Sequence, residues 1–228
     1  MSKITFDVDE YVRPMPKESG VVPKDSFYTR YGKRFLDILI ALIGLIPALP
    51  IMAVISVFVL IDVGRPILFP MTRPGKDGHL FRIYKFHDLN DKKDANGNLL
   101  SPELRTTRIG RVLRSTSLDE LPQLINILKG DMSLIGPRPL LKMYLPGYTD
   151  RQMMRHAVRP GLECPPLIER DHPRTWEEQF EDDVWYVENV SLAVDLKMLW
   201  GVVKIVFDRK DAKRRSEANR PWFVEPKE

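Results

Sequence analysis

One long apolar run constrains this chain more than any other feature. Between Phe35 and Ile61 the only charged residue is Asp37, so the run exceeds the roughly 20 residues that a helix needs to span the hydrocarbon of a bilayer. The mean hydropathy of the whole chain is only −0.24, because the apolar segment is averaged with a polar remainder. The sequence therefore predicts an extended arm, a membrane helix and a globular part, over residues 1–30, 31–62 and 63–228.

Two prolines, Pro47 and Pro50, stand near the middle of the run, where each removes a backbone donor and favours a bend. Basic residues flank both ends of the run: Arg30, Lys33 and Arg34 before it, and Arg65, Arg73 and Lys76 after it. Lys and Arg collect on the cytoplasmic side of membranes, so a re-entrant helix that bends at the prolines and returns keeps both clusters there. An ordinary span with a proline kink is the alternative. Asp37 is expected to reach Arg34 or the interface.

The globular part predicts an α+β fold. Residues 66–86 indicate two strands joined by a Pro-Gly-Lys-Asp-Gly turn, and residues 117–132 indicate a helix that stops at Gly130. A second apolar-rich helix is expected over 195–207, followed by the basic tail "DRKDAKRR". Such segments favour amphipathic helices at the membrane interface, with the tail either on anionic headgroups or simply solvated. The single cysteine, Cys164, excludes a disulfide within the chain.

Charged residues that suit phosphate chemistry concentrate between residues 105 and 161. Four arginines recur at a spacing of three just before the acidic pair Asp119 and Glu120; they are Arg105, Arg108, Arg111 and Arg114. On one helix this spacing forms a cationic patch suited to phosphates. Arg138 and Arg159 each stand in a stiff proline turn. Arginines beside a carboxylate pair predict a phosphorylated substrate, with a carboxylate as nucleophile or Mg²⁺ ligand.

Simpler interpretations of the same residues stay open at this level. Ser117 and Glu120 also fit a helix capping box, in which Glu120 only satisfies the first turn. Pro122 fits that box poorly and could itself begin the helix. The arginine series could equally be a solvated helix face.

Several motifs, in order from about Tyr31 to Phe207, resemble one known family. They are "KRFLDILIALIG" followed by a proline, "FRIYKF", "TSLDELPQLINILKGDMSLIGPRPL", "VRPG" and "WEEQFEDDVWYVENVSLAVDLKML". The chain is similar to the small monotopic phosphoglycosyl transferases of bacteria, the sugar transferase family.

The resemblance implies an enzyme at the cytosolic face of the bacterial inner membrane that contacts one leaflet. It would transfer sugar 1-phosphate from a UDP-sugar to polyprenyl (undecaprenyl) phosphate, release UMP and initiate surface glycan synthesis. Asp119 matches the nucleophile that forms a covalent phosphosugar intermediate, and Glu120 matches a residue that activates the lipid phosphate or binds metal. The family requires Mg²⁺, for which Asp119 is the expected ligand. The expected substrate-binding residues are Lys85, Arg111, Arg114, Arg138 and Arg159.

Three departures from the family pattern bear on these expectations. Leu49 precedes Pro50 where the family has serine, and His87 and Asp88 follow the "YKF" motif. The segment 162–172 also differs, so the donor preference is expected to be unusual, with Arg170 as a candidate substitute for a family arginine.

Two other functions are alternatives to the transferase, and the sequence also allows an oligomer. A catalytically silent member would act as a membrane scaffold, and a membrane-tethered module would bind anionic lipid or nucleic acid through basic residues alone. Nucleic acid is not an expected partner, because the chain lacks the interleaved aromatic and basic residues of a stacking platform. A homo-oligomer is compatible with the sequence.

Overall fold

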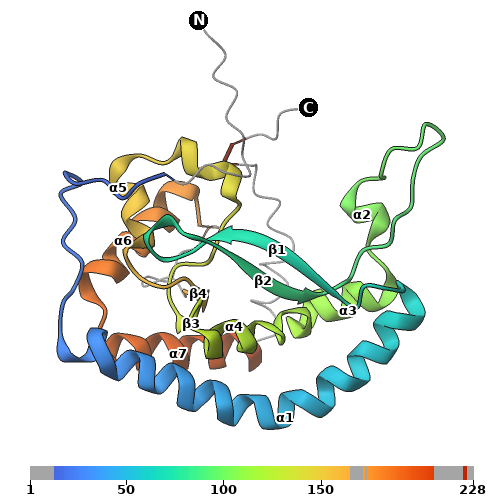
Figure 1. Ribbon diagram of the computed structural model, residues 1–228, viewed down its shortest axis with the longest axis horizontal. Helices are drawn as coiled ribbons and strands as arrows, with labels where there is room; N and C mark the ends of the chain where they lie inside the picture. The colour runs from blue at the N-terminus through green and yellow to red at the C-terminus, as the bar shows by residue number, and fades with distance from the viewer. Residues whose placement is uncertain (1–12, 165–171, 173, 208–222, 225–228) are drawn as a thin grey trace, which may run out of the picture.

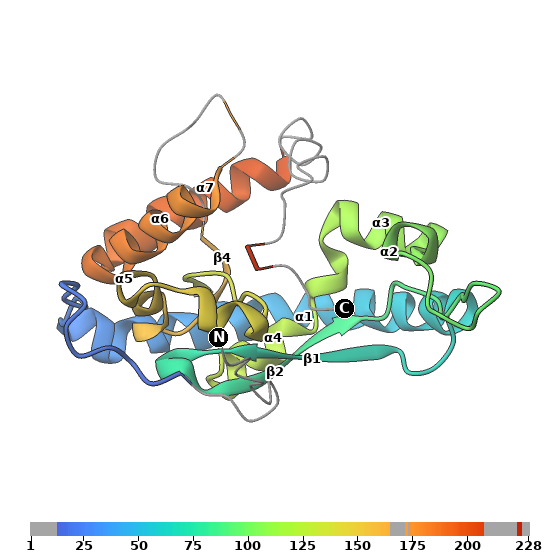
Figure 2. The ribbon, with the colours of Figure 1, turned by 90° about the horizontal axis from the view of Figure 1, so that it is seen from above.

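The computed structural model describes residues 13–164, 172, 174–207 and 223–224 (Figure 1). One long helix underlies a mixture of shorter helices and two small sheets, which confirms the expected α+β class. In the view of Figure 2 the first hairpin lies on one side of the long helix, and the two C-terminal helices lie on the other. The α-helices are α1 (Lys33–Asp62), α2 (Pro102–Arg105), α3 (Arg108–Thr116), α4 (Gln123–Lys129), α5 (Asp150–Met153), α6 (Trp176–Asn189) and α7 (Leu192–Phe207), and the strands are β1 (Leu68–Pro74), β2 (Leu80–Phe86), β3 (Ser133–Ile135) and β4 (Gly161–Glu163).

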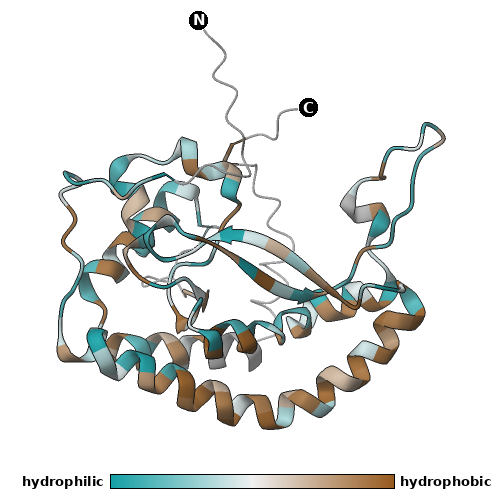
Figure 3. Ribbon diagram, in the orientation of Figure 1, coloured by the Kyte–Doolittle hydropathy of each residue, from teal (hydrophilic) through white to brown (hydrophobic). Residues whose placement is uncertain are grey.

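Helix α1 runs through both prolines without interruption. It follows a π-helical turn over Tyr28–Gly32, and together they make the one helix within the described residues that is long and apolar enough to cross a membrane. Figure 1 shows the helix bowed, with both ends turned toward the globular part, and Figure 3 shows apolar residues along its convex side. The bow agrees with the bend expected from the prolines, whereas the return to one leaflet stays a prediction.

A narrow stripe of α1 packs against the rest of the protein. Ala41, Ala48 and Ile55 are buried at intervals of seven, while most of the large apolar side chains around them are exposed. Ala41 contacts Ile127 of α4 and Met132, so a small side chain lets the two backbones approach closely. The helix therefore binds the globular part along one edge and presents the rest of its apolar surface outward.

The charged residues near the start of α1 serve the fold. Arg34 donates hydrogen bonds to the carbonyl oxygens of Ile127 and Leu128, at 2.6 and 2.9 Å, and so satisfies acceptors at the C-terminal end of α4. Asp37 is buried and accepts hydrogen bonds from Ser133 Oγ and the Leu134 backbone N–H, at 2.9 and 3.0 Å. The expected partnership of Asp37 with Arg34 or the interface is wrong, because strand β3 supplies better placed donors.

The predicted hairpin is confirmed. Strands β1 and β2 pair antiparallel from Leu68 opposite Phe86 to Pro74 opposite Leu80. Arg73 is opposite Phe81, and Met71 is opposite Ile83. Because cross-strand partners share a face and alternate residues return to it, Arg73, Ile83 and Lys85 project from one face of the hairpin.

Two glycines let the short parallel strands β3 and β4 meet. A Cβ atom on Gly161 would lie 2.2 Å from the backbone nitrogen of Gly136, and one on Gly136 would lie 2.6 Å from the carbonyl oxygen of Arg159. Only glycine at both positions allows this contact. It brings the Gly-Pro-Arg-Pro loop, which contains Arg138, against the Val-Arg-Pro-Gly segment.

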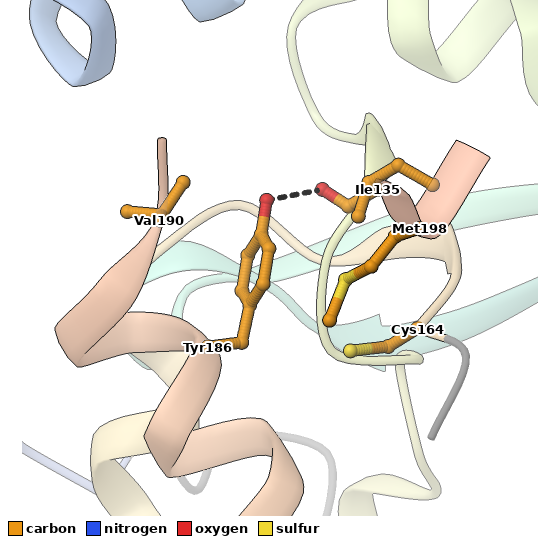
Figure 4. Packing of buried hydrophobic residues seen from close by; sticks show 5 residues of the cluster. All are labelled: Ile135, Cys164, Tyr186, Val190 and Met198. Atoms are coloured by element: carbon orange, nitrogen blue, oxygen red, sulfur yellow. Dashed lines mark hydrogen bonds between the residues drawn. The ribbon is translucent and has the colours of Figure 1, made fainter. Parts of the chain in front are cut away.

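A cluster of buried side chains joins the C-terminal helices to β3 (Figure 4). Tyr186 of α6 packs with Val190, with Met198 of α7 and with Ile135, whose carbonyl oxygen lies 3.2 Å from the tyrosine hydroxyl. Cys164 is buried in the same cluster, which agrees with a packing role for the single cysteine. The basic tail at 208–215 and the candidate Arg170 lie outside the described residues.

Candidate active site

The acidic pair lies on a single 3-10 turn, Leu118–Glu120, between α3 and α4. Ser117 has a left-handed backbone, with φ of 56°, and ends α3 without making a side-chain cap. The capping-box interpretation is therefore wrong, because the Glu120 side chain turns instead toward basic residues of other segments. Helix α4 begins at Gln123, with Pro122 as its N-cap and not its first residue, so it is shorter than the helix predicted over 117–132. The predicted stop at Gly130 is confirmed, because Gly130 caps the helix with φ of 98°.

Glu120 is held by two cations. Its Oε1 atom lies 2.5 Å from Lys85 Nζ of strand β2 and also accepts a hydrogen bond from Arg138 Nη2. Burial favours the neutral acid, but the charges of Arg138 and Lys85 outweigh it and hold the pKa of Glu120 below its usual value. Glu120 is therefore ionised at neutral pH.

Asp119 has a different environment from its neighbour. Its side chain is 9% exposed, and its one described polar contact is Lys85 Nζ at 3.5 Å from Oδ2. Burial raises the pKa of Asp119, and the negative charges of Glu120 and Asp88 add to this, while Lys85 opposes it. A carboxylate with a raised pKa is a better nucleophile than an ordinary one, provided that it is ionised. Two adjacent carboxylates whose environments push their pKa values apart are typical of a catalytic pair.

Arg114 lies beside this pair but is already engaged. It forms an ion pair with Asp88, which follows strand β2. Asp88 is clamped against α3, because the Thr107 backbone N–H donates to its carbonyl oxygen at 3.3 Å and a Cβ on Gly110 would lie 2.2 Å from the same oxygen. The departure from the family at Asp88 thus places a carboxylate on the arginine that was expected to contact phosphate.

Arg138 is positioned by a buried ion pair that sequence reasoning missed. Its carbonyl oxygen accepts a hydrogen bond from Arg155 Nη2 at 2.9 Å, and its own Nη1 donates to the Leu162 carbonyl oxygen at 3.2 Å. Arg155 pairs with Asp183 of α6 at 2.7 Å, and both side chains are 1% exposed. The only signal in the sequence was Asp183 at an apolar position of an amphipathic helix.

The arginine series does not form one helical patch. Thr107 caps α3 by accepting a hydrogen bond from the Gly110 backbone N–H, so Arg105 belongs to the separate helix α2. Arg105 donates to the Asn90 carbonyl oxygen at 2.7 Å. The single-helix prediction was therefore wrong for Arg105, because two threonines interrupt the series.

Two further residues that were predicted to bind substrate, Arg111 and Arg159, make their described hydrogen bonds with groups other than the two carboxylates. Arg111 is exposed and donates to the Thr106 carbonyl oxygen at 3.2 Å. Arg159 donates to the Gly130 carbonyl oxygen at 2.9 Å, just beyond the end of α4. Substrate contact by Arg111 and Arg159 stays a prediction.

A small polar hollow opens beside the pair, between the hairpin face and the Gly-Pro-Arg-Pro loop. Lys85 and Arg138 were expected there, whereas Arg73 and Gln123 were not. The lining residues are Arg73, Ile83, Lys85, Gln123, Arg138, Pro139 and Leu162.

The carboxylates offer a partial metal site. Within the described residues no group of three or more His, Cys, Asp or Glu side chains is placed to hold a metal ion. Mg²⁺, however, typically takes only one or two carboxylates together with substrate phosphate oxygens. Asp119, whose carboxylate feels the negative charges of Asp88 and Glu120, fits a Mg²⁺ ion whose coordination is completed by substrate.

Comparison with known proteins identifies the family. The bacterial sugar transferase family model matches residues 28–209. An uncharacterized sugar transferase, EpsL, of Bacillus subtilis (strain 168) is 45% identical over 174 residues, which cover 76% of this chain and 86% of the relative. A UDP-N-acetylgalactosamine-undecaprenyl-phosphate N-acetylgalactosaminephosphotransferase of Aeromonas hydrophila is 34% identical over 183 residues, 76% of this chain and 43% of that protein. A UDP-glucose:undecaprenyl-phosphate glucose-1-phosphate transferase of Klebsiella pneumoniae is 35% identical over 196 residues, 79% of this chain and 41% of that protein. The chain therefore belongs to the bacterial sugar transferase family.

Proposed function

We propose that this protein transfers sugar 1-phosphate from a UDP-sugar to polyprenyl phosphate and releases UMP, as an initiating step of bacterial surface glycan synthesis. The observation that carries the proposal is the pair formed by a buried, weakly paired Asp119 and a doubly paired Glu120, which share Lys85. Relatives whose names state undecaprenyl-phosphate sugar-phosphate transfer support the same reaction. This chain spans about two fifths of the length of those two relatives.

In the first step a carboxylate oxygen of Asp119 attacks the phosphorus atom that bears the sugar. The phosphorus–oxygen bond to UMP breaks, UMP departs with the electron pair, and an aspartyl phosphosugar forms. In the second step an oxygen of polyprenyl phosphate attacks the same phosphorus atom. The aspartyl–phosphorus bond breaks, and the Asp119 carboxylate is restored. This division replaces one transfer between two phosphates by two simpler displacements.

The basic residues stabilise the negative charge that accompanies both steps. Lys85 lies within reach of both carboxylates. Its ammonium group can stabilise the negative charge of Asp119 before the attack and that of the transferred phosphoryl group afterwards. Arg155 holds the backbone of Arg138, and the Leu162 carbonyl oxygen and Glu120 hold its guanidinium, so this group needs little reorganisation when phosphate arrives. Mg²⁺, held by Asp119 with Asp88 nearby, would neutralise further phosphate charge when bound.

We also propose that α1 dips into the cytoplasmic leaflet of the inner membrane and returns. The support is its bowed shape, its exposed apolar side chains and the basic residues that flank both ends. A protein seated in one leaflet meets the polyprenyl phosphate headgroup and a soluble nucleotide sugar at the same surface.

The test follows UMP release and the covalent intermediate together. Wild-type protein in lipid nanodiscs, with Mg²⁺ and undecaprenyl phosphate, is offered a panel of UDP-sugars. Without the lipid acceptor, mass spectrometry of the protein should show a phosphosugar adduct. Asp119→Asn should abolish both signals, whereas Asp91→Asn, the same change at an exposed position, should leave them intact. Release that survives in Asp119→Asn would refute the nucleophile, and a wild type inactive with every donor would favour a silent scaffold.

A further inference from the structure

Arg73 is a partly buried cation that has no carboxylate partner among the described residues. Within the described residues its Nε atom has no hydrogen-bond acceptor, and its one described polar contact is Nη2 with the Met71 sulfur at 4.0 Å. Burial lowers the pKa of Arg73, and the positive charge of nearby Arg138 lowers it further. A buried cation next to a like charge destabilises a fold unless a partner compensates it.

Two other cations of low exposure are compensated by carboxylates. Arg155 is paired with Asp183 at 2.7 Å, and Lys33 is paired with Asp195 at 2.6 Å. In both cases a carboxylate from a distant segment meets the cation. Arg73 has no such carboxylate among the described residues, and its place on the hairpin face beside Lys85 puts it on the wall of the active-site hollow.

Gln123 presents a second unmatched donor to the same hollow. Its residue is 2% exposed, and its Nε2 atom has no acceptor among the described residues. An amide nitrogen that is buried without a hydrogen-bond acceptor destabilises the fold. The hollow is thus lined by Arg73, Lys85, Arg138 and a buried amide, and no carboxylate is among its lining residues.

We propose that Arg73 and Gln123 form a phosphoryl-binding subsite, in which the guanidinium and the amide donate hydrogen bonds to the non-bridging oxygens of a substrate phosphoryl group. The proposal rests on the proposed function and adds two substrate-binding residues to its site. Two substrates carry this chemistry: the diphosphate of the nucleotide sugar and the headgroup of polyprenyl phosphate. In either case bound phosphate supplies the acceptors that Arg73 Nε and Gln123 Nε2 lack among the described residues.

A binding role and a structural role predict opposite effects on stability. Where a residue supports the fold, its replacement lowers the thermal midpoint. Replacing Arg73 by methionine instead removes a partly buried charge and a repulsion with Arg138, so the midpoint should stay unchanged or rise. The expected signature is a variant that is at least as stable as the wild type and binds substrate more weakly.

The experiment uses the full chain in nanodiscs with Mg²⁺ and compares Arg73→Met and Gln123→Met with the wild type. Arg82→Met is the matched control, because Arg82 is exposed and lies opposite Thr72 on the other face of the hairpin. Titration calorimetry with UDP, which carries both phosphates of the donor, measures the nucleotide arm, and incorporation of undecaprenyl phosphate into the nanodiscs followed by KM measurement gives the lipid arm. UDP binding requires no turnover, so it tests the subsite even if the transferase reaction fails.

In Arg73→Met the affinity for whichever ligand occupies the subsite, the nucleotide or the lipid phosphate, should fall on the order of ten- to a hundredfold. A smaller loss of the same kind is expected in Gln123→Met, and none in Arg82→Met. An effect confined to UDP assigns the nucleotide diphosphate, and an effect confined to the lipid assigns polyprenyl phosphate. Unchanged affinity in both arms, or a thermal midpoint that falls together with both affinities, would overturn the proposal. Gln123→Met decides the matter alone if Arg73→Met does not fold.

Discussion

Lys33 at the start of α1 forms an ion pair with Asp195 at the start of α7, with 2.6 Å between Nζ and Oδ2 and side chains only 12% and 11% exposed. The same carboxylate lies 2.5 Å from the Tyr28 hydroxyl and 2.6 Å from the Tyr186 hydroxyl. Asp195 therefore connects the membrane helix to both C-terminal helices.

Asp195→Asn should destabilise the protein by about 3 kcal/mol, because it leaves the Lys33 charge buried without compensation. For a chain of this size the loss corresponds to a fall in thermal midpoint on the order of 6–12 °C. Asp25→Asn is the control, since its ion pair with Arg30 is more than half exposed and should contribute little. Equal midpoints for the two variants would contradict the role assigned to Asp195.

Asp88→Asn should shift the acidic limb of the pH–activity profile to lower pH. The negative charge of Asp88 is one cause of the raised pKa of Asp119, so its removal lowers that pKa and the nucleophile ionises earlier as pH rises. The profile of kcat/KM for the UDP-sugar is the measurement, with Asp91→Asn as a control at an exposed site. A shift to higher pH, or none, would show that Asp88 does not influence the nucleophile.

Stability should fall on acidification through His156. Burial, together with the charge of Arg155, lowers the pKa of His156 to about 3, while the unfolded value is about 6.5. The unfolded chain therefore binds the proton first, so this contribution is present above pH 6.5 and is lost as pH falls toward 3. Between pH 7 and pH 5 the loss is about 2 kcal/mol. Urea unfolding at the two pH values should show a smaller difference in His156→Gln, and an undiminished one would exclude His156 as the source.

Gly161→Ala should lower the free energy of unfolding by about 1–3 kcal/mol or more. The new methyl group would overlap the backbone of Gly136, where β3 meets β4. Gly44→Ala makes the same substitution where no atom lies within 4 Å, and in a helix it should be neutral or stabilising. Thermal midpoints distinguish the two variants, and transferase activity should decline only in Gly161→Ala, since that contact positions the Arg138 loop.

Local patterns in the sequence predicted the elements that depend on near neighbours. The Pro-Gly-Lys-Asp-Gly turn between two apolar segments predicted the hairpin, and Gly130 predicted the end of α4. The same kind of reasoning failed at Ser117, where a capping pattern was present but the Glu120 side chain was drawn away by Lys85 and Arg138. A local motif forms only when no stronger partner arrives from elsewhere in the fold.

The sequence predicted the two carboxylates of the candidate site and the cations that contact them, but not the other residues that line the hollow. Asp119, Glu120, Lys85 and Arg138 were identified from motifs, and the structure brings them together. Arg73 was noticed only as a flanking charge, because its partial burial near Arg138 depends on how the hairpin meets a loop more than sixty residues later.

By itself, the sequence determined that a long apolar helix begins the fold, that a hairpin follows it and that an acidic pair lies among basic residues. These features follow from hydrophobic length, turn chemistry and residue type, which act over short distances along the chain. Only the tertiary structure decided which charges meet: Arg34 with the end of α4, Lys33 with Asp195, and Arg114 with Asp88. The physical reason is that a buried charge is stabilised by whichever partner folding brings within reach, and that partner is usually distant in sequence.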